Sequence, residues 1–235
     1  MPEKRQNKIL NIIINEHIKE AQPVGSGAIA KKYGLKLSSA TIRHEMKDLE
    51  DKGYIYQPYT SAGRVPTEKG WKYYLENFLS EKKISDQEKK ELEHSFNIKS
   101  DDKKQNVKNL AKKLAEISRE TVIVGFSPEY TYYTGLSHLF RQPEFEEYEL
   151  ICHISEVIDH LDEVIIRLFK NTEKDDFKIL IGQENPFGEN CGAIISKYED
   201  KNGQEGIFTL LGPRRMSYAQ NLSRLKHSHS LLKTI

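Results

Sequence analysis

One stretch decides the fold of the N-terminal part of the chain: residues 38–67 read SSATIRHEMKDLEDKGYIYQPYTSAGRVPT. Ser38 or Ser39 can cap a helix that closes at Gly53, because a serine hydroxyl at an N-cap accepts a hydrogen bond from the first-turn amides. An aromatic, β-branched strand pattern follows, and then a loop that contains Gly63. This order of helix, strand and loop is typical of a recognition helix and its wing.

The segments on either side complete the same fold. Apolar residues recur at helical spacing over residues 4–20, and a second, shorter helix is expected over residues 26–33. After the loop, Thr67 can cap a returning helix that contains Trp71. Residues 1–80 are therefore predicted to form a winged helix-turn-helix.

The rest of the chain predicts an α+β fold. Residues 81–120 are rich in Lys and Glu and indicate a connector of two helices, while residues 121–235 alternate strand and helix patterns. We expect strands at 121–126, 178–181, 193–198 and 206–211, a helical span from about 150 to 168 with a break near Asp162, and a last helix from about 216 to 232. Asn202-Gly203 predicts a hairpin turn between the last two strands, so the sheet should be largely antiparallel.

Composition narrows the class of protein. Of 235 residues 37% are hydrophobic and 30% are charged, too apolar for a disordered chain, and no apolar run approaches the roughly 20 residues of a membrane span. The start, MPEKRQNKIL, lacks the apolar core of a secretory signal, so we expect a soluble, cytoplasmic protein with Cys152 and Cys191 as buried thiols. Residues 1–80 carry 13 Lys and Arg against 9 Asp and Glu, whereas residues 121–235 carry 12 against 17. A basic head on an acidic body suggests a polyanion-binding module joined to a regulatory or assembly domain.

The predicted recognition helix has one face that can meet DNA. At 100° per residue, Ile42, Met46 and Leu49 form a core stripe, and the acidic residues crowd the C-terminal half of the helix. The N-terminal half is therefore the part that can enter a groove, where arginine reads guanine edges or phosphate. Hydroxyls and free amides at the helix start and in the loop suit phosphate contacts. The candidate DNA-binding residues are Ser26, Ser38, Ser39, Ala40, Thr41, Arg43, His44, Lys47, Thr60, Ser61 and Arg64.

The same sequence is compatible with other functions. A winged helix can serve as a protein-interaction or effector-sensing module without operator binding, with Arg43 and Lys47 as a solvated face. His227 and His229 could join a cysteine in a metal site, but side chains two residues apart on a helix do not face one another, so ordinary surface histidines are the better interpretation. We expect no catalytic residues, no metal and no cofactor, since no nucleophile set, carboxylate pair or phosphate-binding glycine loop occurs in a supporting context.

Several motifs resemble a known family. They are Pro23-Val24-Gly25-Ser26, Lys32-Tyr33-Gly34-Leu35, Ala40-Thr41-Ile42-Arg43-His44-Glu45-Met46, Tyr59-Thr60-Ser61-Ala62-Gly63-Arg64-Val65-Pro66-Thr67, Gln142-Pro143-Glu144-Phe145, Ile181-Gly182-Gln183-Glu184-Asn185-Pro186 and Leu211-Gly212-Pro213-Arg214-Arg215-Met216-Ser217-Tyr218-Ala219. In this order they resemble the heat-inducible transcription repressor family, HrcA. The resemblance implies a dimeric repressor of chaperone operons that binds the CIRCE inverted repeat of double-stranded DNA, has a GAF-like second domain and responds to the GroE chaperonin.

The sequence also departs from that family. Gly27, Ser39, His44 and Tyr59 stand where the family usually has Arg, Pro, Asn and His. We therefore predict that His44 alters the operator, because an imidazole cannot make both bonds of an asparagine paired with adenine. Family chains also carry a dimerisation segment inserted between the first strand and the Gln142 motif, and here only residues 127–141 fill that gap. A homodimer is still expected, assembled through the C-terminal domain, since one winged helix contacts too few base pairs to specify a unique DNA site.

Overall fold

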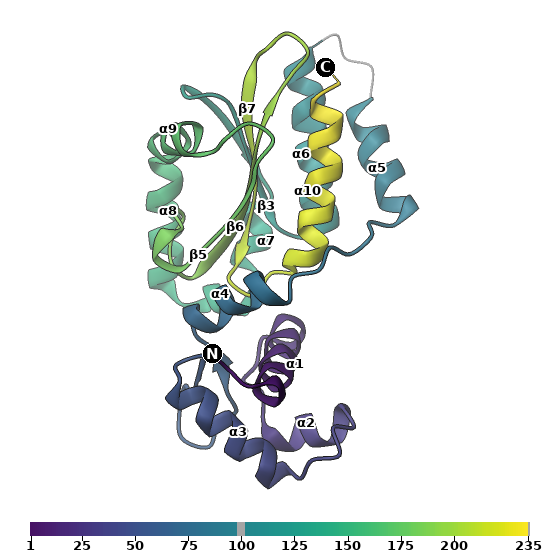
Figure 1. Ribbon diagram of the computed structural model, residues 1–235. Coiled ribbons are helices and arrows are strands. Elements are labelled where there is room, and N and C mark those ends of the chain that lie inside the picture. Colours follow the sequence, from purple (N-terminus) through teal and green to yellow (C-terminus); the bar gives the residue numbers. More distant parts are fainter. Residues whose placement is uncertain (98–101, 235) are drawn as a thin grey trace. The chain divides into compact units, whose positions relative to one another are not determined.

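The computed structural model describes residues 1–97 and 102–234, which divide into two compact units, Met1–Ser80 and Glu81–Ile235. The first unit is a winged helix-turn-helix, as the sequence predicts. Its elements are α1 (Lys4–Glu20), α2 (Ser26–Lys32), α3 (Ser39–Asp51), the short strands β1 (Ile55–Tyr56) and β2 (Val65–Pro66), and α4 (Glu68–Asn77) (Figure 1). β1 and β2 pair antiparallel with Tyr56 opposite Val65, and the loop between them is the wing.

The first unit, Met1–Ser80, is called the head below. Its core is formed by the apolar side chains on the inward faces of its helices. Ile13 of α1, Ile29 of α2 and Leu49 of α3 are fully buried, and Trp71 of α4 is nearly so. Burying an aliphatic side chain of this size stabilises a fold by about 1.5–3 kcal/mol. The stripe on α3 therefore fixes which side of the helix faces the core and which faces solvent.

The second unit is an antiparallel sheet between two layers of helices. Its elements are α5 (Asp86–Phe96), α6 (Lys103–Ser118), β3 (Thr121–Ser127), β4 (Tyr130–Thr134), α7 (Leu136–Phe140), α8 (Tyr148–Asp159), α9 (Leu161–Asn171), β5 (Phe177–Ile181), β6 (Cys191–Glu199), β7 (Glu205–Pro213) and α10 (Tyr218–Leu232). Within the described residues the strand order is β4-β3-β7-β6-β5. Figure 1 shows α6 and α10 on one face of the sheet and α8 and α9 on the other.

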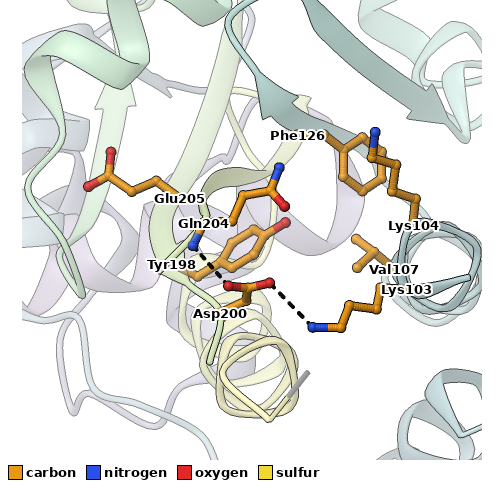
Figure 2. A pocket seen from close by; sticks show the side chains of 8 residues that line it. All are labelled: Lys103, Lys104, Val107, Phe126, Tyr198, Asp200, Gln204 and Glu205. Atoms are coloured by element: carbon orange, nitrogen blue, oxygen red, sulfur yellow. Dashed lines mark hydrogen bonds and ion pairs between the residues drawn. The ribbon is translucent and has the colours of Figure 1, made fainter. Parts of the chain in front are cut away.

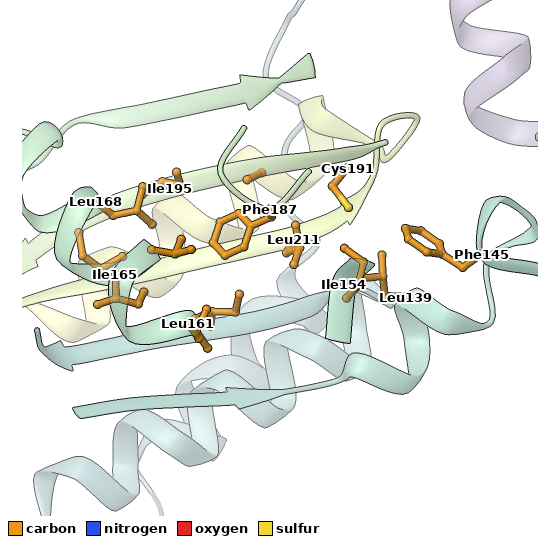
Figure 3. Close-up of a cluster of buried hydrophobic side chains, with 14 residues drawn as sticks. Leu139, Phe145, Ile154, Leu161, Ile165, Leu168, Phe187, Cys191, Ile195 and Leu211 are labelled. Atoms are coloured by element: carbon orange, nitrogen blue, oxygen red, sulfur yellow. The ribbon is translucent and has the colours of Figure 1, made fainter. Parts of the chain in front are cut away.

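A buried cluster fills the space between the sheet and α7–α9 (Figure 3). Ile165 and Leu168 of α9 and Leu139 of α7 lie against Ile195 and Leu211 of the sheet. Gly125 lets α9 come close, since a Cβ there would lie 2.8 Å from the Ile165 side chain. The second unit therefore has a core of its own.

The structure corrects the sequence analysis at several points. β4 was not predicted, so the sheet has one strand more than expected among the described residues. The helical span breaks at His160, close to the predicted Asp162, and becomes α8 and α9. Residues 98–101 of the predicted connector lie outside the described residues; α5 and α6 on either side of them belong to the second unit.

Two predicted side-chain environments were also wrong. His229 is buried rather than on the surface: its ring bonds Asp175 Oδ1 at 2.9 Å and Ser196 Oγ at 3.3 Å. Burial lowers the pKa of His229, against the opposing effect of Asp175. Cys191 is buried as expected, but Cys152 is only half-buried.

A polar chain of contacts runs through the second unit from α5 to the start of β3. Arg224 of α10 donates to Glu88 of α5 at 3.0 Å and to Asn221 Oδ1 at 3.0 Å, and Asn221 in turn donates to Glu120 at 3.3 Å. Glu120 is 6% exposed, and its other oxygen packs against Gly212. Burial raises the pKa of Glu120 to about 8, although the hydrogen bond from Asn221 opposes the shift. This carboxyl is therefore largely neutral at pH 7.

Candidate nucleic-acid interface

The candidate interface is centred on α3, whose start is fixed by a hydroxyl cap. Ser38 Oγ accepts a hydrogen bond from the Thr41 amide at 3.0 Å and lies 2.9 Å from the Thr41 hydroxyl. Ile42, Met46 and Leu49 point into the core, as the spacing predicts. The opposite face of α3, which includes Ala40, is exposed to solvent.

Arg43 and His44 are the free polar side chains of this face. Both are exposed, and within residues 1–97 and 102–234 neither makes a side-chain hydrogen bond or ion pair. An arginine with no partner loses no interaction inside the protein when it binds DNA. Its planar fork can pair with guanine O6 and N7 or with a phosphate.

Lys47 is exposed but already paired. Its ammonium lies 2.8 Å from Asp51 and 3.7 Å from Glu50, and the hydrogen bond with Asp51 raises the pKa of Lys47. Lys47 is charged at neutral pH, yet its charge is shared with two carboxylates. An ammonium has three N–H donors, so Lys47 can also meet phosphate, with a charge that these carboxylates partly offset.

Ser26 lies at the junction of α2 and α3. Its side chain is buried, and its hydroxyl lies 3.1 Å from the Ser39 hydroxyl. The pair ties the first turns of the two helices together. Gly25 and Gly27 flank Ser26 with no atom within 4 Å of a Cβ built on either residue, so the backbone beside Ser26 is open.

Gly63 and Arg64 of the wing pack against Val24, in the segment between α1 and α2. The Arg64 backbone pairs with Val24 in both directions at 2.9 Å, and a Cβ on Gly63 would lie 2.4 Å from the Val24 carbonyl carbon. The Arg64 side chain donates to Glu50 at 3.1 Å. Arg64 is therefore a structural part of the wing as well as a cation beside the groove.

The wing tip is polar and exposed. Thr60 and Ser61 face solvent, and Ser61 adopts a left-handed backbone conformation with φ of 69°. Gln57 closes the loop by donating to the Ala62 carbonyl at 3.0 Å. Tyr59, which the sequence analysis did not select as a contact residue, is 66% exposed at the same tip.

A groove of about 550 Å³ lies between α2, α3 and the wing. Of the candidate residues, Ser26, Arg43, Ser61 and Arg64 line it, together with Gln57. Ser38, Ser39, Ala40, Thr41, His44, Lys47 and Thr60 do not line the groove. The structure thus brings the arginines of the helix and the wing to one concavity, and sequence reasoning missed Gln57, which carries no charge or motif signal.

The second unit has a smaller cavity at the start of α6 (Figure 2). Its volume is about 40 Å³, and it is lined by Lys103, Phe126, Tyr198 and Asp200 among others. Asp200 accepts hydrogen bonds from the amides of Asn202 and Gln204 and lies 3.7 Å from Lys103. A cavity of this size has room for about one water molecule, not for a nucleotide-sized effector.

Metal sites and membrane spans are absent from the described part of the chain. Residues 1–97 and 102–234 contain no group of three or more His, Cys, Asp or Glu side chains able to hold a metal ion. Over the same residues no helix is both long and apolar enough to cross a bilayer.

Comparisons with known proteins agree with this architecture. A family model described as the HrcA protein C terminal domain matches residues 71–221, and a model of the ribonuclease R winged-helix domain matches residues 7–73. A crystal structure of a hypothetical protein at 2.2 Å resolution superposes with a TM-score of 0.80, covering 99% of this chain and 98% of that one. At 19% identity this match shows the fold alone.

The similar curated proteins are heat-inducible transcription repressors HrcA. That of Pelotomaculum thermopropionicum is 41% identical over 125 residues, which cover 53% of this chain but only 36% of the relative. That of Thermodesulfovibrio yellowstonii is 27% identical over 345 positions, 100% of this chain and 98% of the relative. Since this chain has 235 residues, the longer alignment leaves positions of the relative without a counterpart here.

Proposed function

The chain belongs to the HrcA family, and from that premise we propose that it is a sequence-specific DNA-binding repressor of heat-shock, or chaperone, operons. One observation carries the proposal: Arg43, an exposed arginine without a partner in the described residues, stands on the outer face of α3 where the wing and α2 form a groove. An unpaired arginine on the exposed face of a capped helix fits major-groove readout.

In the proposed complex, the N-terminal half of α3 enters the major groove. Arg43 and His44 meet base edges or phosphate, while Ala40 permits close approach of the helix. Ser38, Ser39 and Thr41 at the helix start, and Thr60, Ser61 and Arg64 in the wing, contact the DNA backbone. Ser26 acts through its bond to Ser39, and Lys47 adds a positive charge that Asp51 partly offsets.

The proposed operator is an inverted repeat read by two copies of the chain. A twofold DNA site matches a twofold protein, and the second unit supplies the body through which two copies would pair. Sedimentation at micromolar concentration should show a homodimer, free and on DNA; a monomer in both states would reject this part of the proposal. GroE as a modulator remains an expectation from the family.

Binding of this kind needs no catalytic step, and the proposal implies a protein that acts on DNA in the cytoplasm. The alternative is a winged-helix module for protein interaction or effector sensing, without operator binding. The two differ in their response to DNA sequence and to salt.

The test is selection from random duplex DNA by the full chain, followed by a salt titration of the recovered fragments. We expect enrichment of one inverted repeat and a linear fall of log K with log salt, by about 0.9 for each phosphate contacted. Recovery of unenriched DNA with no salt dependence would contradict the proposal and favour the interaction module.

A further inference from the structure

Glu50 occupies an unexpected place for an acidic residue in a DNA-binding head. It follows Arg43 by seven residues and Lys47 by three, so the three side chains share one stripe of α3. A carboxylate on the DNA-facing stripe repels phosphate. On charge alone, removing Glu50 should tighten DNA binding.

The contacts of Glu50 point the other way. Its Oε2 accepts from Arg64 Nη2 at 3.1 Å, and the two side chains are only 22% and 16% exposed. The Arg64 backbone also pairs with Val24. Arg64 is therefore joined to α3 by its side chain and to the segment between α1 and α2 by its backbone.

From these contacts we infer that Glu50 is a positioning residue for DNA binding, which holds Arg64 and the wing at the edge of the groove. This inference rests on the proposed DNA-binding function. Glu50 touches no DNA in this account; it acts through Arg64. The electrostatic cost of one carboxylate is outweighed by the placement of the wing.

The other acidic residues of α3 do not have this role. Glu45 pairs with Arg5 at 3.0 Å, and Asp48 accepts from Gln6 at 3.3 Å, both on α1. Asp51 is 61% exposed and pairs with Lys47. Of these carboxylates, Glu50 alone meets the wing in the described residues.

Without Glu50, Arg64 would lose its only carboxylate in the described part of the chain. Its remaining side-chain partners are the carbonyls of Ala62 and Gly63 at 3.5 and 3.4 Å, and its Nε is buried with no hydrogen bond among the described residues. A half-buried cation left without a counter-charge is unfavourable, so the guanidinium would turn outward and the wing tip would shift with it.

The experiment measures affinity of the full chain for the duplex recovered by selection, at one salt concentration. Glu50→Ala should bind about fivefold more weakly than the unchanged protein, the loss expected for a partly buried ion pair. Asp51→Ala is the matched control, because it removes the neighbouring carboxylate and releases Lys47, so its affinity should be equal or higher. Glu50→Ala binding more tightly than the unchanged protein, the result that charge alone predicts, would overturn the inference.

The same substitution made in an Arg64→Ala variant separates a positioning role from a general loss of stability. In Arg64→Ala protein there is no guanidinium to hold, so adding Glu50→Ala should leave affinity unchanged or raise it. A loss of similar size in both backgrounds would overturn the inference. Glu50→Met keeps the length of the side chain but offers Arg64 no carboxyl or amide oxygen, and it serves if the alanine variant unfolds: weaker binding than the unchanged protein supports the positioning role, and tighter binding contradicts it. If the unchanged protein binds no duplex, the proposed function itself fails, which is a different result.

Discussion

Arg43→Ala is the substitution with the clearest expected effect. The Arg43 side chain is exposed and makes no side-chain bond within residues 1–97 and 102–234, so its loss should change the free energy of unfolding by less than about 0.5 kcal/mol. Any loss of affinity then reports on DNA contacts rather than on folding.

The size of that loss follows from the geometry. A bidentate arginine–guanine pair contributes about 1–3 kcal/mol of discrimination, which is about 5- to 150-fold in affinity. If two heads bind one inverted repeat, both lose the contact and the cost should approach twice that of a single half-site. A base-reading Arg43 also predicts a relaxed preference at one base position in each half-site.

The assay is equilibrium binding of the full chain to duplexes that differ at single positions, at fixed salt. Arg167→Ala is the control: it removes an exposed arginine from α9 of the second unit, where it pairs with Glu163 of the same helix at 3.8 Å, and it should leave affinity unchanged. Uniform weakening with a reduced salt slope would assign Arg43 to phosphate instead. Unchanged affinity and unchanged preference, in protein that is still folded, would refute the placement of Arg43 in the interface.

Three further predictions test the site and the fold. His44→Asn should strengthen binding to the CIRCE repeat by about tenfold, because asparagine can pair bidentately with adenine; equal affinities under one salt condition would mean that residue 44 does not set specificity. Gly63→Ala should destabilise the head by more than about 2 kcal/mol, since its Cβ would meet the Val24 carbonyl carbon at 2.4 Å, whereas Gly27→Ala has open space and should not; thermal unfolding of the two variants decides this. Glu120→Gln should matter most in alkaline solution: a folded-state pKa of about 8, above the unfolded value, means that stability is lost as pH rises from the unfolded value through 8. The stability of the Gln variant relative to the unchanged protein should therefore rise between about pH 4.5 and about pH 8 and level off above that, and a constant difference across this range would contradict the buried, neutral carboxyl.

Local signals were enough to predict the head. Ser38 as a cap and the spacing of Ile42, Met46 and Leu49 place α3 and its core face, and both depend on residues close in sequence. The exposure of Arg43 and His44 follows from the same spacing. The pattern alone therefore predicts the winged helix, and the structure confirms it.

Contacts between distant residues could not be predicted in this way. Glu50 and Arg64 are 14 residues apart, and they meet only because the wing folds back against α3. The burial of Ser26 depends on how α2 approaches Ser39. The burial of His229 has a related cause, because its neighbours Ser196 and Asp175 lie on β6 and in the turn before β5, far from it in sequence.

The missed strand has a different cause. β4, residues Tyr130–Thr134, reads YTYYT and lies at an edge of the sheet, with its side chains exposed or half-buried. An edge strand of this kind lacks the alternation of apolar and polar residues that marks a half-buried strand. Its place beside β3 is set by pairing, with Ile123 opposite Tyr133.

The central claim is that this chain recognises one DNA sequence through its N-terminal head. The most direct measurement compares the affinity of the full chain for the selected inverted repeat with that for a duplex of equal length and scrambled sequence, at physiological salt. Specific binding predicts a ratio of about 1,000 or more, with most of it lost when one half-site is scrambled. Equal affinities for the repeat and the scrambled duplex would contradict the account.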